Sequence, residues 1–241
     1  MTVTCLQLDL KKISDHLQNK SSPPWTWVFY GDSLTHGAAH TRGFRSFPEI
    51  FAERVRWEMR LLYDVVINTG ISGQTTVQLL DEKRYQWRVR RFAPDVVFIL
   101  IGSNDIVKLK NVDTYRQNLL ELVRRVRNDG AIPVLQTYPT ILRVPENDKY
   151  MLRYRDFPEY NQAIRQLAAD ESVILVDHHL YWQQFAADEK ILKLWLGEAI
   201  HPGGKGHLEM AKLIFRNLDI FDPESSCCNP VGTPWSLPEE E

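Results

Sequence analysis

Five short apolar runs alternate with amphipathic stretches along most of the 241-residue chain, and this alternation limits the possible folds. The runs are rich in β-branched and aromatic residues and cover residues 25–30, 64–68, 95–101, 132–137 and 173–176. Such runs are typical of strands that are buried on both faces. Between them, apolar residues recur every three or four positions, as in helices that pack on a sheet. The pattern predicts an α/β fold with a five-stranded parallel sheet covered on both faces.

Charge and hydropathy restrict the partners. The chain has 29 Lys and Arg against 31 Asp and Glu, a net charge of −2 at pH 7. Because there is no basic excess, we expect no binding to nucleic acid or to an anionic membrane. No apolar run reaches the roughly 18–20 residues that cross a bilayer, and residues 1–12 do not resemble a secretory signal. We therefore expect a cytoplasmic protein without stable membrane association, and its oligomeric state stays open.

Composition divides the chain into three parts. Residues 1–24 are an N-terminal extension with one short helix over 10–17, and they end in a Pro-Pro pair that indicates a linker. Residues 25–221 carry the alternating pattern and form the predicted domain. Residues 222–241 are rich in Pro, Ser, Gly and Glu, so we expect a flexible acidic tail, although Trp235 and Leu237 could dock on the domain. The three cysteines predict no disulfide framework.

Residues with catalytic chemistry directly follow the predicted strands, where ligands bind in parallel sheets. Ser33 follows the first strand, although an isolated serine at such a place is more often a turn or capping residue. Gly73 follows the second strand, just before a helix start that Thr75 and Gln78 mark by their capping-box spacing. Asn104 follows the third strand, where its amide can point at an anionic oxygen. Each signal is weak when it is taken alone.

A further pair of candidate residues lies near the C-terminus. Glu198 and His201 are three residues apart, so the carboxylate can bind one imidazole nitrogen and leave the other free as a base. Together with Ser33 they supply a nucleophile, a base and an orienting group. The N–H groups of Ser33 and Gly73 and the amide of Asn104 supply three donors for an oxyanion. The combination favours an acyl-transfer site over separate structural roles.

The chain resembles the SGNH (GDSL) hydrolase superfamily of esterases, lipases, thioesterases and carbohydrate deacetylases. Four blocks in the family's order carry the resemblance: Gly31-Asp32-Ser33-Leu34, Asn68-Thr69-Gly70-Ile71-Ser72-Gly73, Gly102-Ser103-Asn104-Asp105 and His201-Pro202. The resemblance covers residues 27–218, which is most of the chain. It implies a flavodoxin-like, three-layer α/β/α sandwich around a five-stranded parallel sheet, in agreement with the pattern above.

The resemblance also implies roles for individual residues. Ser33 is the nucleophile and His201 is the general base and then the acid, while Ser33, Gly73 and Asn104 form the oxyanion hole. One position departs from the family, because an aspartate usually stands where this chain has Glu198. We expect Glu198 to orient His201, and the alternatives are Asp177 or no carboxylate at all.

No cofactor or metal is expected. The run Asp177-His178-His179 contains possible metal ligands, but adjacent side chains on an extended segment point to opposite sides. The G-x-S-x-G elbow of α/β-hydrolases is also missing, because Thr35 replaces its second glycine.

The resulting hypothesis is a serine esterase that hydrolyses small-molecule carboxylic esters through an acyl-enzyme. We expect short-chain or carbohydrate-linked acyl groups such as acetyl, with His36, Tyr138 and Trp195 as substrate contacts. Three alternatives stay open: a long-chain lipase or thioesterase, an acyltransferase with the same triad, and a ligand-binding member of the fold without turnover.

Overall fold

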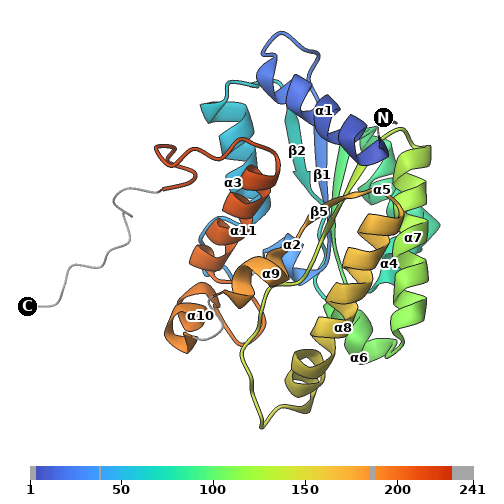
Figure 1. The fold of residues 1–241 in the computed structure, drawn as a ribbon, viewed down its shortest axis with the longest axis vertical. Helices are drawn as coiled ribbons and strands as arrows, with labels where there is room; N and C mark the ends of the chain where they lie inside the picture. Colours follow the sequence, from blue (N-terminus) through green and yellow to red (C-terminus); the bar gives the residue numbers. More distant parts are fainter. Residues whose placement is uncertain (1–3, 38, 185–187, 230–241) are drawn as a thin grey trace, which may run out of the picture.

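A computed structural model of the chain describes residues 4–37, 39–184 and 188–229 (Figure 1). Five parallel strands form one sheet in the order β2-β1-β3-β4-β5. The strands are β1 (Thr26–Gly31), β2 (Val65–Asn68), β3 (Val96–Leu100), β4 (Ile132–Gln136) and β5 (Ile174–Val176). Each lies within one residue of, or inside, a run predicted from the sequence. The predicted five-stranded parallel sheet is confirmed, in the order of flavodoxin-like folds.

Helices cover both faces of the sheet and complete the predicted sandwich (Figure 1). The helices before the third strand are α1 (Cys5–Gln18), α2 (Ser33–His36), α3 (Phe47–Ala52), the π-helix η1 (Glu53–Glu58), α4 (Thr76–Leu80), α5 (Glu82–Arg88) and the 3₁₀-helix η2 (Arg90–Phe92). Those after it are α6 (Ser103–Lys108), α7 (Val112–Asn128), α8 (Asp148–Asp170), α9 (His178–Gln183), α10 (Glu189–Trp195) and α11 (Gly204–Asn217). Helices α3 and α11 lie together on one face, and α4, α7 and α8 lie on the other.

The central strands explain the unbroken apolar runs in the sequence. Every residue of β3 and β4 is buried, whereas the edge strand β2 is only partly covered. Both faces of the central strands contact helices, so no position on them needs a polar side chain. Aromatic rings join the sheet to α3, with Phe29 stacked on Phe98 at 4.4 Å and both in contact with Phe51.

Helix α1 is longer than the helix expected over residues 10–17, and it packs on the domain that we expected to begin at residue 25. A capping box of Thr4 and Gln7 starts it, and Ile13 and Leu17 are buried in the core. Its His16 binds Asp64, which also accepts the indole N–H of Trp27 at 2.8 Å. These contacts hold α1 at the amino ends of the strands, opposite the expected site.

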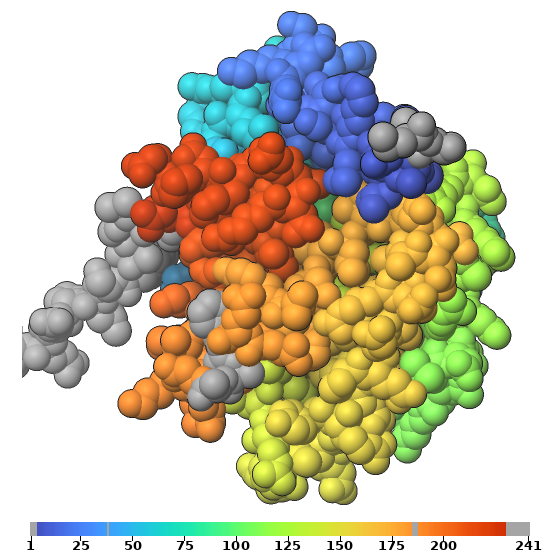
Figure 2. Space-filling view, viewed as in Figure 1, coloured from blue at the N-terminus to red at the C-terminus, as the bar shows by residue number. Residues whose placement is uncertain are grey.

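The C-terminal segment differs in part from the expected flexible tail. Residues 222–229 pack against the rest of the chain and bury Cys227 and Cys228 (Figure 2, red). Glu58 of η1 accepts hydrogen bonds from the Ser225 hydroxyl and from the Cys227 N–H. The composition of this segment did not reveal these distant partners. Residues 230–241, with Trp235 and Leu237, lie outside the described residues. The three cysteines are free.

A helix that crosses a membrane must be both long and apolar. Within the described part of the chain, no helix combines the length and apolar character needed to cross a bilayer.

Candidate active site

The candidate site lies where the chain changes direction across the sheet. From β1 the chain runs to β2 on one side, and it then returns to β3 on the other. The loops after β1 and β3 therefore diverge and leave a crevice at the carboxyl ends of these strands. Ser33 follows β1 and Asn104 follows β3, so both lie at this position, as the sequence predicts.

The position of Ser33 depends on a close approach of two strands. Gly31 lies beside Leu100, where a Cβ atom on residue 31 would come within 2.2 Å of the Leu100 carbonyl oxygen. Glycine is therefore required for the turn out of β1. Ser33 is then the first residue of α2, and the Asp32 carboxylate caps this short helix by accepting the Leu34 N–H at 3.2 Å.

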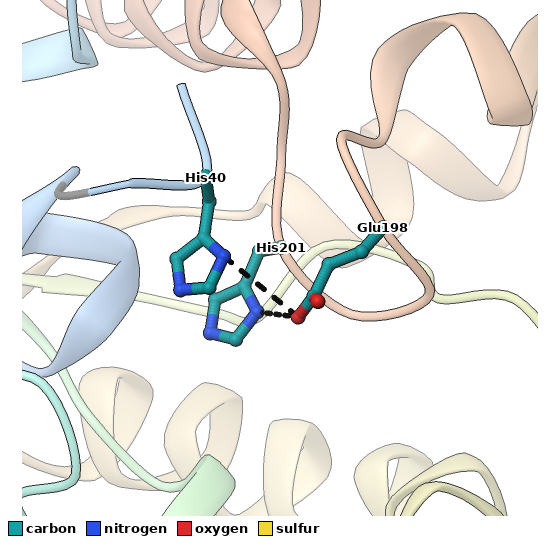
Figure 3. Close-up of side chains that lie close together, drawn as sticks. All are labelled: His40, Glu198 and His201. Atoms are coloured by element: carbon teal, nitrogen blue, oxygen red, sulfur yellow. Dashed lines mark hydrogen bonds and ion pairs between the residues drawn. The ribbon is translucent and has the colours of Figure 1, made fainter. Parts of the chain in front are cut away.

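A chain of hydrogen bonds joins Ser33, His201 and Glu198. The Ser33 hydroxyl lies 2.8 Å from Nε2 of His201, and Nδ1 of the same ring binds Oε1 of Glu198 (Figure 3). Burial lowers the pKa of His201, against the neighbouring Glu198 carboxylate, which raises it. The imidazole is therefore neutral at pH 7 and can accept a proton at Nε2.

Asp177, the alternative orienting residue, is bound elsewhere. Its carboxylate accepts hydrogen bonds from Arg165 at 2.6 and 3.0 Å and from the Thr137 hydroxyl at 2.9 Å. Burial alone would raise the pKa of Asp177, but the hydrogen bonds from Arg165 and its other partners lower it. Glu198, rather than Asp177, is therefore the carboxylate in contact with His201.

The three predicted oxyanion donors come from three different loops. Gly73 has a φ of +82°, a left-handed conformation that favours glycine, and Thr75 caps the following helix α4 as expected. The Asn104 amide donates to the Gln74 carbonyl at 2.9 Å and lies 3.3 Å from an Asp32 oxygen. The amide thus connects the segments that carry Gln74 and Asp32, and a ligand oxygen would replace one of these two acceptors.

Only one of the three predicted substrate contacts lies on the rim of the site. His36 is exposed and its Nδ1 lies 3.1 Å from the Ser72 hydroxyl. Tyr138 and Trp195 are instead buried in the core, with exposed fractions of 2% and 5%. Little of either side chain is accessible to a ligand, and a role of the two in substrate binding stays a prediction.

A buried network below Ser33 was not identified from the sequence. The Tyr138 hydroxyl donates to Asp32, which is fully buried. Arg153 of α8 donates to the carbonyl and hydroxyl oxygens of Ser103, beside Asn104. Asp32 lies inside the nucleophile block, which could have drawn attention to it. Its partner Tyr138 is 106 residues away, however, so the local sequence did not indicate the contact.

The pKa of Asp32 is raised by burial to about 7, although the hydrogen bonds from Tyr138 and Leu34 lower it. Its unfolded value is 3.8. Because the folded state holds this proton more tightly, the protonated carboxyl stabilises the fold at low pH. That contribution is lost as the pH rises through the range from about 4 to 7.

Asp32→Asn should remove this loss of stability. Between pH 4 and pH 8, wild type should lose up to about 4 kcal/mol more unfolding free energy than the variant. Urea unfolding of both proteins across this range measures the difference. Parallel curves for the two proteins would contradict the assignment, because every other titrating group is shared.

The predicted absence of a metal at residues 177–179 rested on a wrong local structure. His178 and His179 begin helix α9 rather than continuing an extended segment. Their nitrogens have other neighbours, since Nε2 of His178 lies 3.0 Å from the Gln136 amide oxygen and Nδ1 of His179 lies 3.1 Å from an Arg165 nitrogen. The absence of a metal or cofactor stays a prediction.

A groove of about 850 Å³ adjoins the Glu198–His201 loop. His40 and Gly197 line its edge, and its basic side chains outnumber its two acidic ones, Glu53 and Glu209. The basic residues are Arg42, Arg45, Lys193, Lys205 and Lys212. Arg45 is paired with Glu53 and Lys212 with Glu209, so the positive charge of the groove is smaller than this count suggests.

Comparison with a known protein family agrees with this arrangement. The model of the GDSL-like lipase/acylhydrolase family matches residues 29–208, which include Ser33, Gly73, Asn104, Glu198 and His201. The chain belongs to this family. The expected resemblance is thereby confirmed, and so is the enzyme class, a hydrolase that acts on ester bonds.

Individual relatives in the family include named esterases. A probable rhamnogalacturonan acetylesterase of Bacillus subtilis, YesY, is 31% identical over 168 residues, which are 64% of this chain and 76% of the relative. A GDSL-like esterase of Mycobacterium tuberculosis, Rv1075c, is 27% identical over 125 residues, which are 51% of this chain and 39% of that protein.

Solved structures with the same fold extend over most of the chain. Axe2, an acetylxylan esterase from Geobacillus stearothermophilus, superposes with a TM-score of 0.63 at 21% identity, covering 83% of this chain and 96% of Axe2. LAE5, an alpha/beta hydrolase enzyme from the metagenome of Lake Arreo, gives 0.69 at 20% identity, with coverage of 84% and 99%. At these identities the likeness establishes the fold.

Proposed function

We propose that the protein is a serine esterase that removes acetyl or other short acyl groups from carbohydrates through an acyl-enzyme. The continuous hydrogen-bond chain from Ser33 through His201 to Glu198 is the observation that carries this proposal. It joins a hydroxyl to a neutral imidazole that is oriented by a carboxylate, the combination that activates an alcohol as a nucleophile.

In the first half-reaction His201 accepts the Ser33 proton at Nε2 while the hydroxyl oxygen attacks the ester carbonyl. The resulting oxyanion is held by the N–H groups of Ser33 and Gly73 and by the side-chain amide of Asn104. Glu198 keeps the His201 proton on Nδ1 and stabilises the imidazolium that forms. The imidazolium then protonates the leaving alcohol, and an acyl-Ser33 ester remains.

In the second half-reaction water takes the place of the alcohol. His201 removes a proton from this water as it attacks the acyl carbonyl, and the same donors hold the second oxyanion. Collapse of this intermediate returns the proton to Ser33 and releases the acid. The reaction needs no group beyond the residues of the chain.

Two observations support a short acyl group on a carbohydrate. YesY is named a probable rhamnogalacturonan acetylesterase and Axe2 an acetylxylan esterase. The groove beside the Glu198–His201 loop is lined by Lys and Arg side chains as well as by apolar ones such as Phe44 and Leu208, so it offers both charge and an apolar surface to the alcohol part of a carbohydrate ester. The predicted cytoplasmic location stays a prediction that cell fractionation can test.

A series of p-nitrophenyl esters from acetyl to palmitoyl tests this function, followed by acetylated xylan and rhamnogalacturonan fragments. We expect kcat/KM to be highest for acetyl and to fall as the chain lengthens, because the proposal rests on relatives that are named as esterases of acetyl groups. Acetate release from the fragments measures the natural reaction.

Each alternative predicts a different result in this series. A maximum at long acyl chains would indicate a lipase or thioesterase, and transfer of acetyl to added sugars in place of hydrolysis would indicate an acyltransferase. A folded protein without turnover on any ester would favour the ligand-binding alternative and contradict the proposal.

A further inference from the structure

His40 lies face to face on the imidazole of His201. The ring centroids are 3.5 Å apart and the ring planes differ by 1° (Figure 3). Nδ1 of His40 is 3.8 Å from Oε1 of Glu198, the same oxygen that binds Nδ1 of His201. Glu198 therefore faces two imidazoles, of which only that of His201 is bound to Ser33.

The geometry of these three side chains is unsuited to a shared metal ion, although their ligand atoms lie within 4.8 Å of one another. An imidazole binds a metal through a lone pair in the plane of its ring. The lone pairs of two parallel rings 3.5 Å apart lie in separate parallel planes, so they cannot meet at one metal ion. The arrangement is a stacked pair of rings that compete for one carboxylate.

We propose that His40 is a positioning residue that supports the base His201 while His40 is neutral and opposes it when His40 is protonated. This inference rests on the proposed esterase function. In the neutral form, the face of the His40 ring covers the His201 ring that becomes cationic during acyl transfer, and an aromatic face attracts a cation.

A proton on His40 reverses this support. It places a positive charge 3.5 Å from the ring that must itself become positive, and like charges at this distance repel. It also makes His40 a competitor for Glu198, which then binds His201 less well. A proton on either ring before the ester is attacked therefore opposes turnover, and the active resting form has both rings neutral.

Three other groups, Arg42, Arg153 and His207, act on the His40–His201 pair or lie near it. Arg42, from the segment of His40, donates to the Gly197 carbonyl at 3.1 Å. Burial is the main cause that lowers the pKa of His201, and His40 and the charge of Arg153 on α8 lower it further. His207 of α11 also faces the pair, and burial lowers its pKa to about 3, so it stays neutral above that pH. These three groups keep their charge in the range of the test below, and Asp32, whose pKa of about 7 lies within it, is shared by every variant compared.

The test compares kcat and KM of wild type, His40→Phe and His40→Ala on p-nitrophenyl acetate from about pH 4.5 to pH 8.5. Phenylalanine keeps an aromatic face but cannot be protonated, so the acid midpoint of kcat/KM should move to lower pH. Alanine should cause the same move and also lower kcat at pH 8.5 by roughly three- to thirtyfold, because the face that covers His201 is lost.

His36→Phe is the matched control. It removes an imidazole from the same rim, but one that contacts Ser72 rather than Glu198. Because His36 is also a predicted substrate contact, only the acid midpoint of kcat/KM is compared for this variant, and it should equal that of wild type. An unmoved midpoint in His40→Phe, or a wild-type kcat at pH 8.5 in His40→Ala, would overturn the inference.

Proton NMR of the imidazole C–H groups separates this inference from the proposed function, because it needs no turnover. In wild type the His201 resonances should titrate in two steps, since each ring senses the proton on the other. In His40→Phe they should titrate in one step. A single step in an active wild-type enzyme would reject only the role of His40 and leave the esterase function in place. Two steps in an inactive protein would reject only the esterase function.

Discussion

Ser33→Ala should lower the kcat for p-nitrophenyl acetate by roughly 10⁴–10⁶-fold, the size of effect seen when a serine nucleophile is removed. The expected loss is this large because the Ser33 hydroxyl is the group bound to Nε2 of His201. The remaining rate would come from the oxyanion donors acting on water. Steady-state kinetics measures the loss, and circular dichroism checks that the fold is kept.

Ser72→Ala is the matched control for this variant. Ser72 lies on the rim and its hydroxyl contacts His36, so its removal should leave most of the activity. Mass spectrometry after acid quenching should show an added acetyl group on wild type and none on Ser33→Ala. An acylated Ser33→Ala protein would place the nucleophile elsewhere.

Glu198→Gln should have the second largest effect and lower kcat by roughly 10²–10⁴-fold. A glutamine amide cannot stabilise the imidazolium of His201, and its N–H₂ group favours the wrong tautomer of the ring. The loss should be smaller than for Ser33 because the Glu198 side chain is 39% exposed, so water can replace part of its charge. Steady-state kinetics with p-nitrophenyl acetate at pH 8 measures it.

Two further variants show whether the carboxylate itself is responsible. Glu198→Asp keeps the charge and restores the residue type usual in the family, so it should retain much more activity than Glu198→Gln. Asp177→Asn removes a carboxylate that binds Arg165 and Thr137, so it should affect stability more than kcat. A Glu198→Gln enzyme with wild-type kcat would reject the orienting role.

The elements of the fold and the order of the site residues were accessible from the sequence because they depend on local pattern. Strands buried on both faces leave unbroken apolar runs, as in β3 and β4, which are wholly buried. The capping box of Thr75 and Gln78 likewise acts over three residues, and it placed the start of α4 correctly. The positions of Ser33, Gly73 and Asn104 at strand ends follow from these boundaries.

Contacts between distant segments required the tertiary structure. Tyr138 was predicted on a rim loop, but it is buried and its hydroxyl binds Asp32, 106 residues earlier. The composition of residues 222–229 predicts a flexible tail, but Ser225 in this segment binds Glu58, which lies 167 residues earlier in the sequence. In both cases the local residues do not specify the partner, because the free energy of the contact depends on which buried groups meet.

The environment of His201 shows the same division. The spacing of Glu198 and His201 determined that a carboxylate and an imidazole could meet, since three residues span one short loop. Whether Glu198 or Asp177 binds the ring was decided by the fold, which places Arg165 on Asp177. The stacking of His40 on His201 also appears only there, because it joins segments 161 positions apart, and a short-range pattern contains no information about such a pair.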